Sequence, residues 1–177
     1  LITHVTPLPE APRLMAGGFT EIVERLCDDD LRWWNEERTK KFIESLSVTQ
    51  RLRFDRLGEC EAFVARTAYR RMRNGVPVWE LRDDDIAGCL RTARGGSSKQ
   101  AVVVFEGGST RIRWMTGVEY AKLQGADDFK LDGFRESNVQ YAFGDAVAVP
   151  VVRWLMRAAV IPAIDARVKV RNTRVAI

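Results

Sequence analysis

The stretch AVVVFEGGSTRIRW, from Ala101 to Trp114, carries the clearest strand pattern in the chain. Two runs rich in β-branched residues flank Gly107-Gly108, and this arrangement is typical of a β-hairpin with a tight turn. A second stretch of the same kind, Val76–Leu81, lies upstream. Together they predict a small, twisted antiparallel sheet in the middle of the chain.

Helical patterns are found on both sides of these strands. The predicted helices span Phe19–Leu26, Leu31–Leu46, Val48–Leu57, a short stretch from Gly117 that stops at Gly125, and Ala148–Ala159. The second of these presents one apolar face, made of Leu31, Trp34, Phe42, Ile43 and Leu46. Capping boxes are predicted at Ser47/Gln50, Thr116/Glu119 and Ser137/Gln140. The sequence therefore predicts an α+β fold: N-terminal helices, a small antiparallel sheet with basic loops, and a C-terminal helical segment.

Composition excludes several classes of protein. The chain has 177 residues, of which 46% are hydrophobic, with three scattered cysteines and one histidine, His4. This argues against a disulfide scaffold, a zinc site and a Ser–His–Asp triad. The longest apolar run, Val147–Leu155, contains Pro150 and Arg153 and is shorter than the ~20 residues of a membrane span. We therefore expect a cytoplasmic protein without a secretory signal. Because the first residue is Leu1, the chain is expected to be processed or recombinant, to begin at a non-standard start codon, or to be a fragment of a longer reading frame.

Positive charge is concentrated in the second part of the chain. Residues 1–62 hold 9 Lys/Arg and 12 Asp/Glu, a balance of −3, and residues 63–177 hold 19 and 12, a balance of +7, which gives the total of +4. No basic amphipathic helix accompanies this charge, so it indicates a polyanionic partner rather than a membrane.

Two basic segments without acidic residues stand out, Arg66–Gly75 and Cys89–Gln100. Arginine can read guanine with two hydrogen bonds and can also stack, and glycine lets a backbone approach DNA closely. The spacing in the second segment does not fit a phosphate-binding P-loop. The alternative is that both segments are solvated loops. The candidate DNA-binding residues are Arg66, Arg70, Arg71, Arg73, Arg91, Thr92, Arg94, Gly95, Gly96, Ser97, Ser98 and Lys99.

Two stretches in the C-terminal third, Arg111–Phe129 and Ser137–Val152, resemble the ninth and tenth motifs of DNA (cytosine-5) methyltransferases. The residues that match the ninth motif are Arg113, Thr116, Glu119, Leu123, Gln124, Gly125, Asp128 and Phe129. Those that match the tenth are Gln140, Tyr141, Gly144, Ala146 and Val147, with Asp145 where the family usually has Asn. The stretch CLRTARGGSS is similar to a loop in the family's target-recognition region. The resemblance covers roughly residues 66–159.

The resemblance implies a role in S-adenosylmethionine-dependent methylation of cytosine in double-stranded DNA, as in restriction–modification. It implies that Gly144, Asp145, Ala146 and Val147 contact the cofactor. It also implies that Arg113, Thr116 and Glu119 form a structural hinge between a target-recognition region and a catalytic core. The family's Phe-x-Gly-x-Gly, Pro-Cys-Gln and Glu-Asn-Val segments do not occur in this chain. The chain alone is therefore expected to have no catalytic residue and no metal, and to need a partner segment or subunit.

The predicted regions are an N-terminal arm and helices (1–62), a target-recognition region (63–115), a helical part that completes a methyltransferase core (116–166) and a basic tail (167–177). Two other hypotheses remain open from the sequence. The chain could be a non-enzymatic DNA-binding module derived from a methyltransferase, or a structural protein whose arginines form a solvated face.

Overall fold

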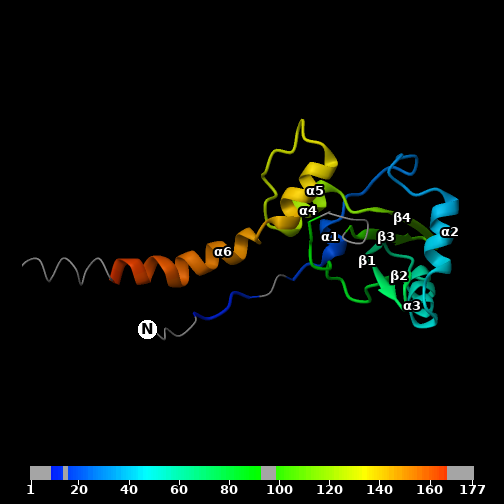
Figure 1. The fold of residues 1–177 in the computed structure, drawn as a ribbon, viewed down its shortest axis with the longest axis horizontal. Helices are drawn as coiled ribbons and strands as arrows, with labels where there is room; N and C mark the ends of the chain where they lie inside the picture. The colour runs from blue at the N-terminus through cyan, green and yellow to red at the C-terminus, as the bar shows by residue number, and fades with distance from the viewer. Residues whose placement is uncertain (1–8, 14–15, 93–98, 167–177) are drawn as a thin grey trace, which may run out of the picture. The chain divides into compact units, whose positions relative to one another are not determined.

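A computed structural model describes residues 9–13, 16–92 and 99–166 (Figure 1). The chain divides into two compact units, one of residues 16–146 and one of residues 1–15 with 147–177. The larger unit contains five helices and a four-stranded sheet among its described residues, and the smaller one is helical. The predicted α+β class is thereby confirmed.

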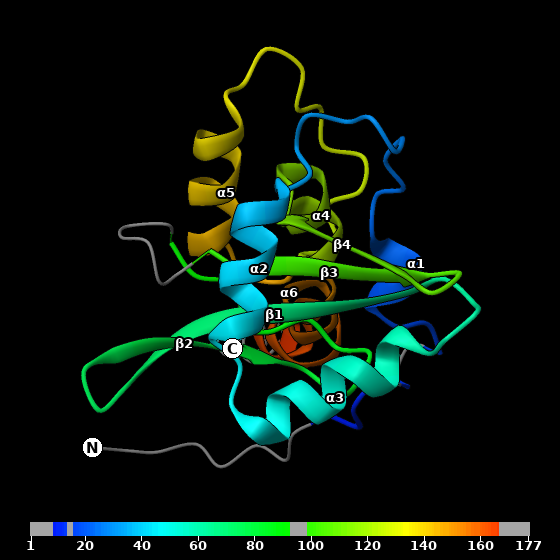
Figure 2. The ribbon, with the colours of Figure 1, turned by 90° about the vertical axis from the view of Figure 1, so that its right-hand side faces the viewer.

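The sheet is antiparallel throughout. Its strands are β1 (Val64–Arg73), β2 (Val76–Leu81), β3 (Ala101–Glu106) and β4 (Ser109–Trp114), in the spatial order β2-β1-β3-β4 (Figure 2). The predicted hairpin is confirmed, with Ala101 opposite Trp114 and positive φ angles of 53° and 73° at Gly107 and Gly108. Glycine adopts positive φ angles without strain because it has no Cβ atom.

Strand β1 was missed by the sequence analysis, which took its arginines for part of a basic loop. It pairs with β3 through its first half and with β2 through its second half. Asn74 and Gly75, with φ angles of 49° and 78°, join β1 to β2 in the way expected for an Asn-Gly hairpin turn. The outer end of this hairpin is exposed on both faces. Arginines can therefore occupy successive positions there without burial.

Helices cover both faces of the sheet, and this explains the continuous apolar run in β3. Val102 and Val104 pack with α1 (Phe19–Ile22), α4 (Gly117–Leu123) and α5 (Glu136–Asp145). Val103 and Phe105 pack on the other side with α2 (Glu36–Glu44) and α3 (Val48–Gly58). Figure 2 shows these two helices on one face of the sheet. A strand buried on both faces needs apolar residues at every position.

The start of α2 differs from the prediction. The helix begins at Glu36 rather than Leu31, because the Asn35 side chain accepts a hydrogen bond from the Arg38 N–H at 3.0 Å and caps it. Trp33 forms an isolated β-bridge with Arg113 instead of a helical turn. Leu31, predicted on the apolar face, is fully exposed.

The capping box predicted at Ser137/Gln140 is wrong. Helix α5 begins two residues earlier, with Arg135 rather than Ser137 at the N-cap position, and it has no side-chain cap. Gln140 is instead buried, and its Nε2 donates to the Met115 carbonyl at 2.8 Å. In contrast, the box at Thr116/Glu119 is present in full at the start of α4. Ser47 caps α3, but Gln50 accepts a hydrogen bond from the Leu81 N–H and does not complete a box.

The smaller unit contains α6 (Val149–Leu155) and a π-helical turn, η1 (Met156–Val160). Pro150 lies in the first turn of α6, as predicted. The expectation that no stretch reaches the length of a membrane span needs correction, because helical structure continues past Pro150 and Arg153. The 31 residues Glu136–Ala166 are long and apolar enough to cross a membrane by length and composition alone, and an 18-residue window within them has a mean hydropathy of 1.7.

Candidate nucleic-acid interface

A groove of about 540 Å³ brings the two predicted basic segments together. We call it the basic groove. It lies between the β1–β2 hairpin and the chain that leads into β3. Its lining residues are Tyr69, Arg70, Arg71, Met72, Arg73, Arg82, Gly88, Cys89, Arg91 and Gln100. Strand β1 thus places its arginines beside Arg91, although some twenty residues separate them in sequence.

Two carboxylates neutralise part of this groove. Glu80, opposite Tyr69 in the sheet, forms ion pairs with Arg71 at 3.2 Å and with Arg73. Burial raises the pKa of Glu80, but hydrogen bonds from Arg73 and Tyr69 outweigh this effect and hold the pKa below its ordinary value. Arg82 pairs with Asp84 at 2.5 Å.

Arg70 and Arg91 are the unpaired cations of the groove. Their guanidinium groups form no hydrogen bond or ion pair with any of the residues that the structure describes. Five arginines face two carboxylates, so the groove keeps a positive balance. A concave surface with such a balance attracts anions, and its unpaired arginines can bind phosphates or base edges.

Arg66 is not part of this groove. Its Nη1 donates to Asp85 Oδ1 at 2.8 Å and to Thr20 Oγ1 at 3.1 Å, and its side chain is only 15% exposed. These contacts tie α1 to the sheet. A role for Arg66 in DNA binding stays a prediction that its position does not favour.

The second basic segment is described only at its ends. Arg94, Gly95, Gly96, Ser97 and Ser98 lie outside the described residues. Thr92 Oγ1 donates a hydrogen bond to Asp145 Oδ1 at 2.5 Å. Lys99 lines a different cavity, between α2 and α5.

The turn predicted to contact the cofactor lies directly against this segment. A Cβ atom on Gly144 would be 2.5 Å from the Arg91 carbonyl oxygen and 2.7 Å from the Thr92 nitrogen. Only glycine permits so close an approach of two backbones. Gln124 Nε2 holds the same turn by donating to the Phe143 carbonyl at 2.9 Å and to the Ala146 carbonyl at 3.2 Å. Val147, the fourth predicted contact, belongs to the smaller unit.

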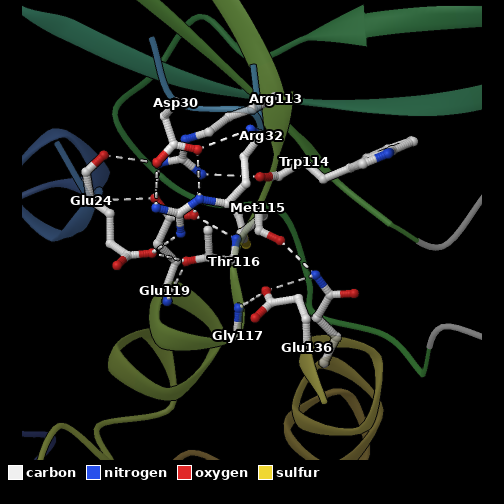
Figure 3. Close-up of polar contacts among 11 residues, drawn as sticks. Glu24, Asp30, Arg32, Arg113, Trp114, Met115, Thr116, Gly117, Glu119 and Glu136 are labelled. Atoms are coloured by element: carbon white, nitrogen blue, oxygen red, sulfur yellow. Dashed lines mark hydrogen bonds and ion pairs between the residues drawn. The ribbon is translucent and has the colours of Figure 1, made fainter. Parts of the chain in front are cut away.

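The predicted hinge residues form one buried network (Figure 3). Arg113 and Glu119 are both fully buried and paired through two hydrogen bonds, at 2.8 Å and 2.5 Å. Glu119 also accepts hydrogen bonds from the backbone N–H groups of Thr116 and Glu24, at 2.8 Å and 2.9 Å. Arg113 donates to the carbonyl of Glu24 at 3.0 Å. The network therefore joins the end of β4 and the start of α4 to the chain after α1.

Several residues of the site were not predicted from the sequence. Glu80 and Asp84 were not recognised as partners of the groove arginines, because the pairing depends on the β1–β2 register. Gln124 was known only as a motif match, and its role in holding the Gly144 turn appears only in the structure. The alternation of Tyr69, Arg71 and Arg73 before Asn74-Gly75 was the available signal for the strand.

Within the described ranges, no group of three or more His, Cys, Asp or Glu residues could hold a metal ion, and Cys27, Cys60 and Cys89 are free. Comparison with protein-family models, with curated proteins and with solved structures gave no match. The interpretation therefore depends on the residues of this chain.

Proposed function

We propose that this chain is the target-recognition and core-completing portion of an S-adenosylmethionine-dependent DNA (cytosine-5) methyltransferase. It acts either as part of a longer chain or as one subunit of a split enzyme. One observation supports this function above the others: the basic segment, at Arg91 and Thr92, packs against the Gly144–Asp145 turn. A methyltransferase must hold its DNA-reading loop close to its methyl donor, and this contact provides such an arrangement.

Double-stranded DNA is the proposed partner of the basic groove. Arg70 and Arg91 are its primary phosphate or base contacts, because no described residue competes for them. Arg71, Arg73 and Arg82 are already paired with carboxylates and contribute less unless DNA displaces those partners. Gly95, Gly96, Ser97 and Ser98 stay candidates for base contacts.

The cofactor turn of this chain fits a contact rather than a complete pocket. S-adenosylmethionine, when bound, supplies the methyl group. Here the side chain of Asp145 already accepts a hydrogen bond from Thr92, and the carbonyl of Ala146 already accepts one from Gln124. The groups of this turn that are still available to a cofactor are its other backbone atoms and the second carboxylate oxygen of Asp145. These residues would position one edge of a cofactor that another polypeptide segment holds.

The same reasoning assigns the nucleophile to a partner. Cytosine methylation at C5 requires a thiolate that attacks C6. Cys27, Cys60 and Cys89 stand in contexts unlike Pro-Cys-Gln, and no other cysteine is present. The partner is therefore a segment or subunit that carries Pro-Cys-Gln, and this chain contributes orientation of DNA and closure of the core.

The smaller unit has a surface that such a partner would cover. Apolar side chains are exposed along it, namely Val147, Val151, Val152, Leu155, Met156, Ile161 and Ile164. A bilayer is a less suitable environment, because Arg153 and Arg157 lie within this stretch and each would cost about 2.5–3.5 kcal/mol near the membrane centre. We therefore place the protein in the cytoplasm, associated with the nucleoid.

The second candidate is a DNA-binding module without enzymatic activity, and the absence of Pro-Cys-Gln from the chain favours it. Both candidates require DNA binding, so they share a first test. Alanine variants of Arg70 and Arg91 are compared with wild type on a duplex across a salt series. Each lost phosphate contact should reduce the magnitude of the salt slope by about 0.9. Lys40→Ala, which changes an exposed side chain of α2, is the control. Unchanged affinity and slope in both arginine variants would contradict the assignment of the groove.

A further inference from the structure

A second cavity, of about 570 Å³, lies on the other side of the segment that leads into β3. We call it the tryptophan pocket. Its walls come from the stretch before α2, the end of β4 and one face of α5. The side chains used below are Trp33, Trp34, Arg38, Lys99, Trp114, Glu136 and Gln140. Its size is typical of sites for small organic molecules.

Aromatic rings and unpaired cations lie together in this pocket. The rings of Trp34 and Trp114 are 5.1 Å apart between centroids, and Arg38 lies over both, at 4.2 Å and 4.9 Å. Burial lowers the pKa of Arg38 relative to its ordinary value. Neither Arg38 nor Lys99 forms an ion pair with any residue in the described ranges. Indole surfaces beside free cations suit a planar ligand that carries an anionic group.

The pocket also contains unused hydrogen-bonding capacity. Trp34 Nε1, a donor, and Gln140 Oε1, an acceptor, are buried without a partner among the described residues, and Gln140 is only 2% exposed. Buried polar groups in folded proteins nearly always have a partner, so two such atoms on the walls of one cavity require an explanation. Both atoms are covered by protein in this structure.

A carboxylate adds a preference for amino groups. Glu136 Oε1 accepts hydrogen bonds from the Gly117 N–H and from Gln140 Nε2 at 3.2 Å (Figure 3), while its Oε2 accepts none from the described residues. Among the described residues, Glu136 Oε2 therefore remains as an acceptor on the pocket wall. A carboxylate acceptor of this kind matches the exocyclic amino group of a nucleobase such as cytosine or adenine.

We propose that the tryptophan pocket binds a single nucleotide, with its base against the indoles and its phosphate on Arg38 and Lys99. The proposal rests on the proposed function only in that DNA is one source of the nucleotide. Lys99 lines this pocket, whereas Arg91 and Gln100 line the basic groove. A nucleotide that leaves a duplex on the groove therefore has this pocket nearby. A free nucleoside monophosphate is the other source of the same chemistry.

The test uses the full chain and two ligands. Fluorescence anisotropy compares a duplex that contains one unpaired cytidine with the same duplex fully paired. Tryptophan fluorescence follows titration with dCMP and, separately, with dTMP. The variant R38Q/K99Q removes both cations and keeps every tryptophan of the pocket. Lys40→Gln is the control on α2, and Arg70→Gln is the control in the basic groove.

Wild type should prefer the duplex with the unpaired cytidine by about tenfold, because one stacked base contributes at about that level. R38Q/K99Q should lose this preference, Lys40→Gln should keep it, and Arg70→Gln should weaken both duplexes equally. A free nucleotide is the ligand if the two duplexes bind equally but dCMP quenches tryptophan fluorescence more than dTMP does. This quenching must be lost in R38Q/K99Q. Equal duplex affinities with no dCMP response, or a preference that persists in R38Q/K99Q, would overturn the proposal. Arg70-dependent duplex binding would then still support the proposed function.

Discussion

The buried pair of Arg113 and Glu119 allows the sharpest prediction about the hinge. Glu119 accepts four hydrogen bonds, two from Arg113 and one each from the backbone of Thr116 and Glu24. Glu119→Gln keeps the shape of the side chain but removes its charge. It also turns one oxygen into a donor, so two of the four donors lose their acceptor. Breaking a buried pair on one side costs about 3–5 kcal/mol, because the remaining charge is left without compensation.

Urea denaturation followed by circular dichroism measures this loss. With a slope of roughly 2 kcal/mol per molar urea, the midpoint should fall by about 2 M. The control is Glu37→Gln, which breaks an exposed pair with Lys41 and should cost no more than about 0.5 kcal/mol. The double variant Arg113→Met with Glu119→Gln should be more stable than the sum of the single losses predicts. If Glu119→Gln alone stays within about 1 kcal/mol of wild type, the network does not stabilise the junction of β4 and α4.

Three further predictions concern the groove and the turn beside it. Glu80→Gln should release Arg71 and Arg73, so that affinity for duplex DNA rises and the salt slope steepens by up to about two contacts; weaker binding would show that Glu80 orients the arginines for DNA. Gly144→Ala should destabilise the larger unit by about 1–3 kcal/mol in the same urea assay, because the new Cβ meets the backbone of Arg91 and Thr92; an unchanged midpoint would mean that this contact is loose. Asp145→Asn keeps an oxygen that can accept the hydrogen bond from Thr92, so the affinity of the assembled enzyme for S-adenosylmethionine, measured by calorimetry, should be unchanged or higher. If the substitution abolishes binding, Asp145 has a direct role in cofactor binding that needs its charge.

Local sequence patterns were enough to predict the elements whose structure is determined by residues close together in the sequence. Gly107-Gly108 between two β-branched runs gave the β3–β4 hairpin, and Thr116 with Glu119 gave the start of α4. Both depend on neighbours in sequence. The start of α2 could not be predicted from local patterns. The chain before it is held extended by the β-bridge between Trp33 and Arg113, which are far apart in the sequence.

In the candidate site, too, the sequence predicted the residue types, whereas their grouping and pairing depend on the tertiary structure. The arginines of β1 and Arg91 were recognised as basic, but their grouping in one groove depends on the sheet and on the chain that returns to β3. Which of them are free depends on Glu80 and Asp84, whose pairing is set by strand register. Arg66 looks identical to its neighbours in the sequence, yet Asp85 and Thr20 already hold it.

The most direct test of the proposed function is reconstitution of methyl transfer. The purified chain is mixed with the polypeptide, from the same or a neighbouring reading frame, that carries Phe-x-Gly-x-Gly and Pro-Cys-Gln. Transfer of a labelled methyl group from S-adenosylmethionine to duplex DNA is then followed for each component and for the mixture. The proposal predicts 5-methylcytosine in the mixture alone, and a decrease when Arg70 and Arg91 are both replaced by alanine. Methylation by this chain without a partner would contradict it, as would a mixture that forms a complex on DNA and transfers no methyl group.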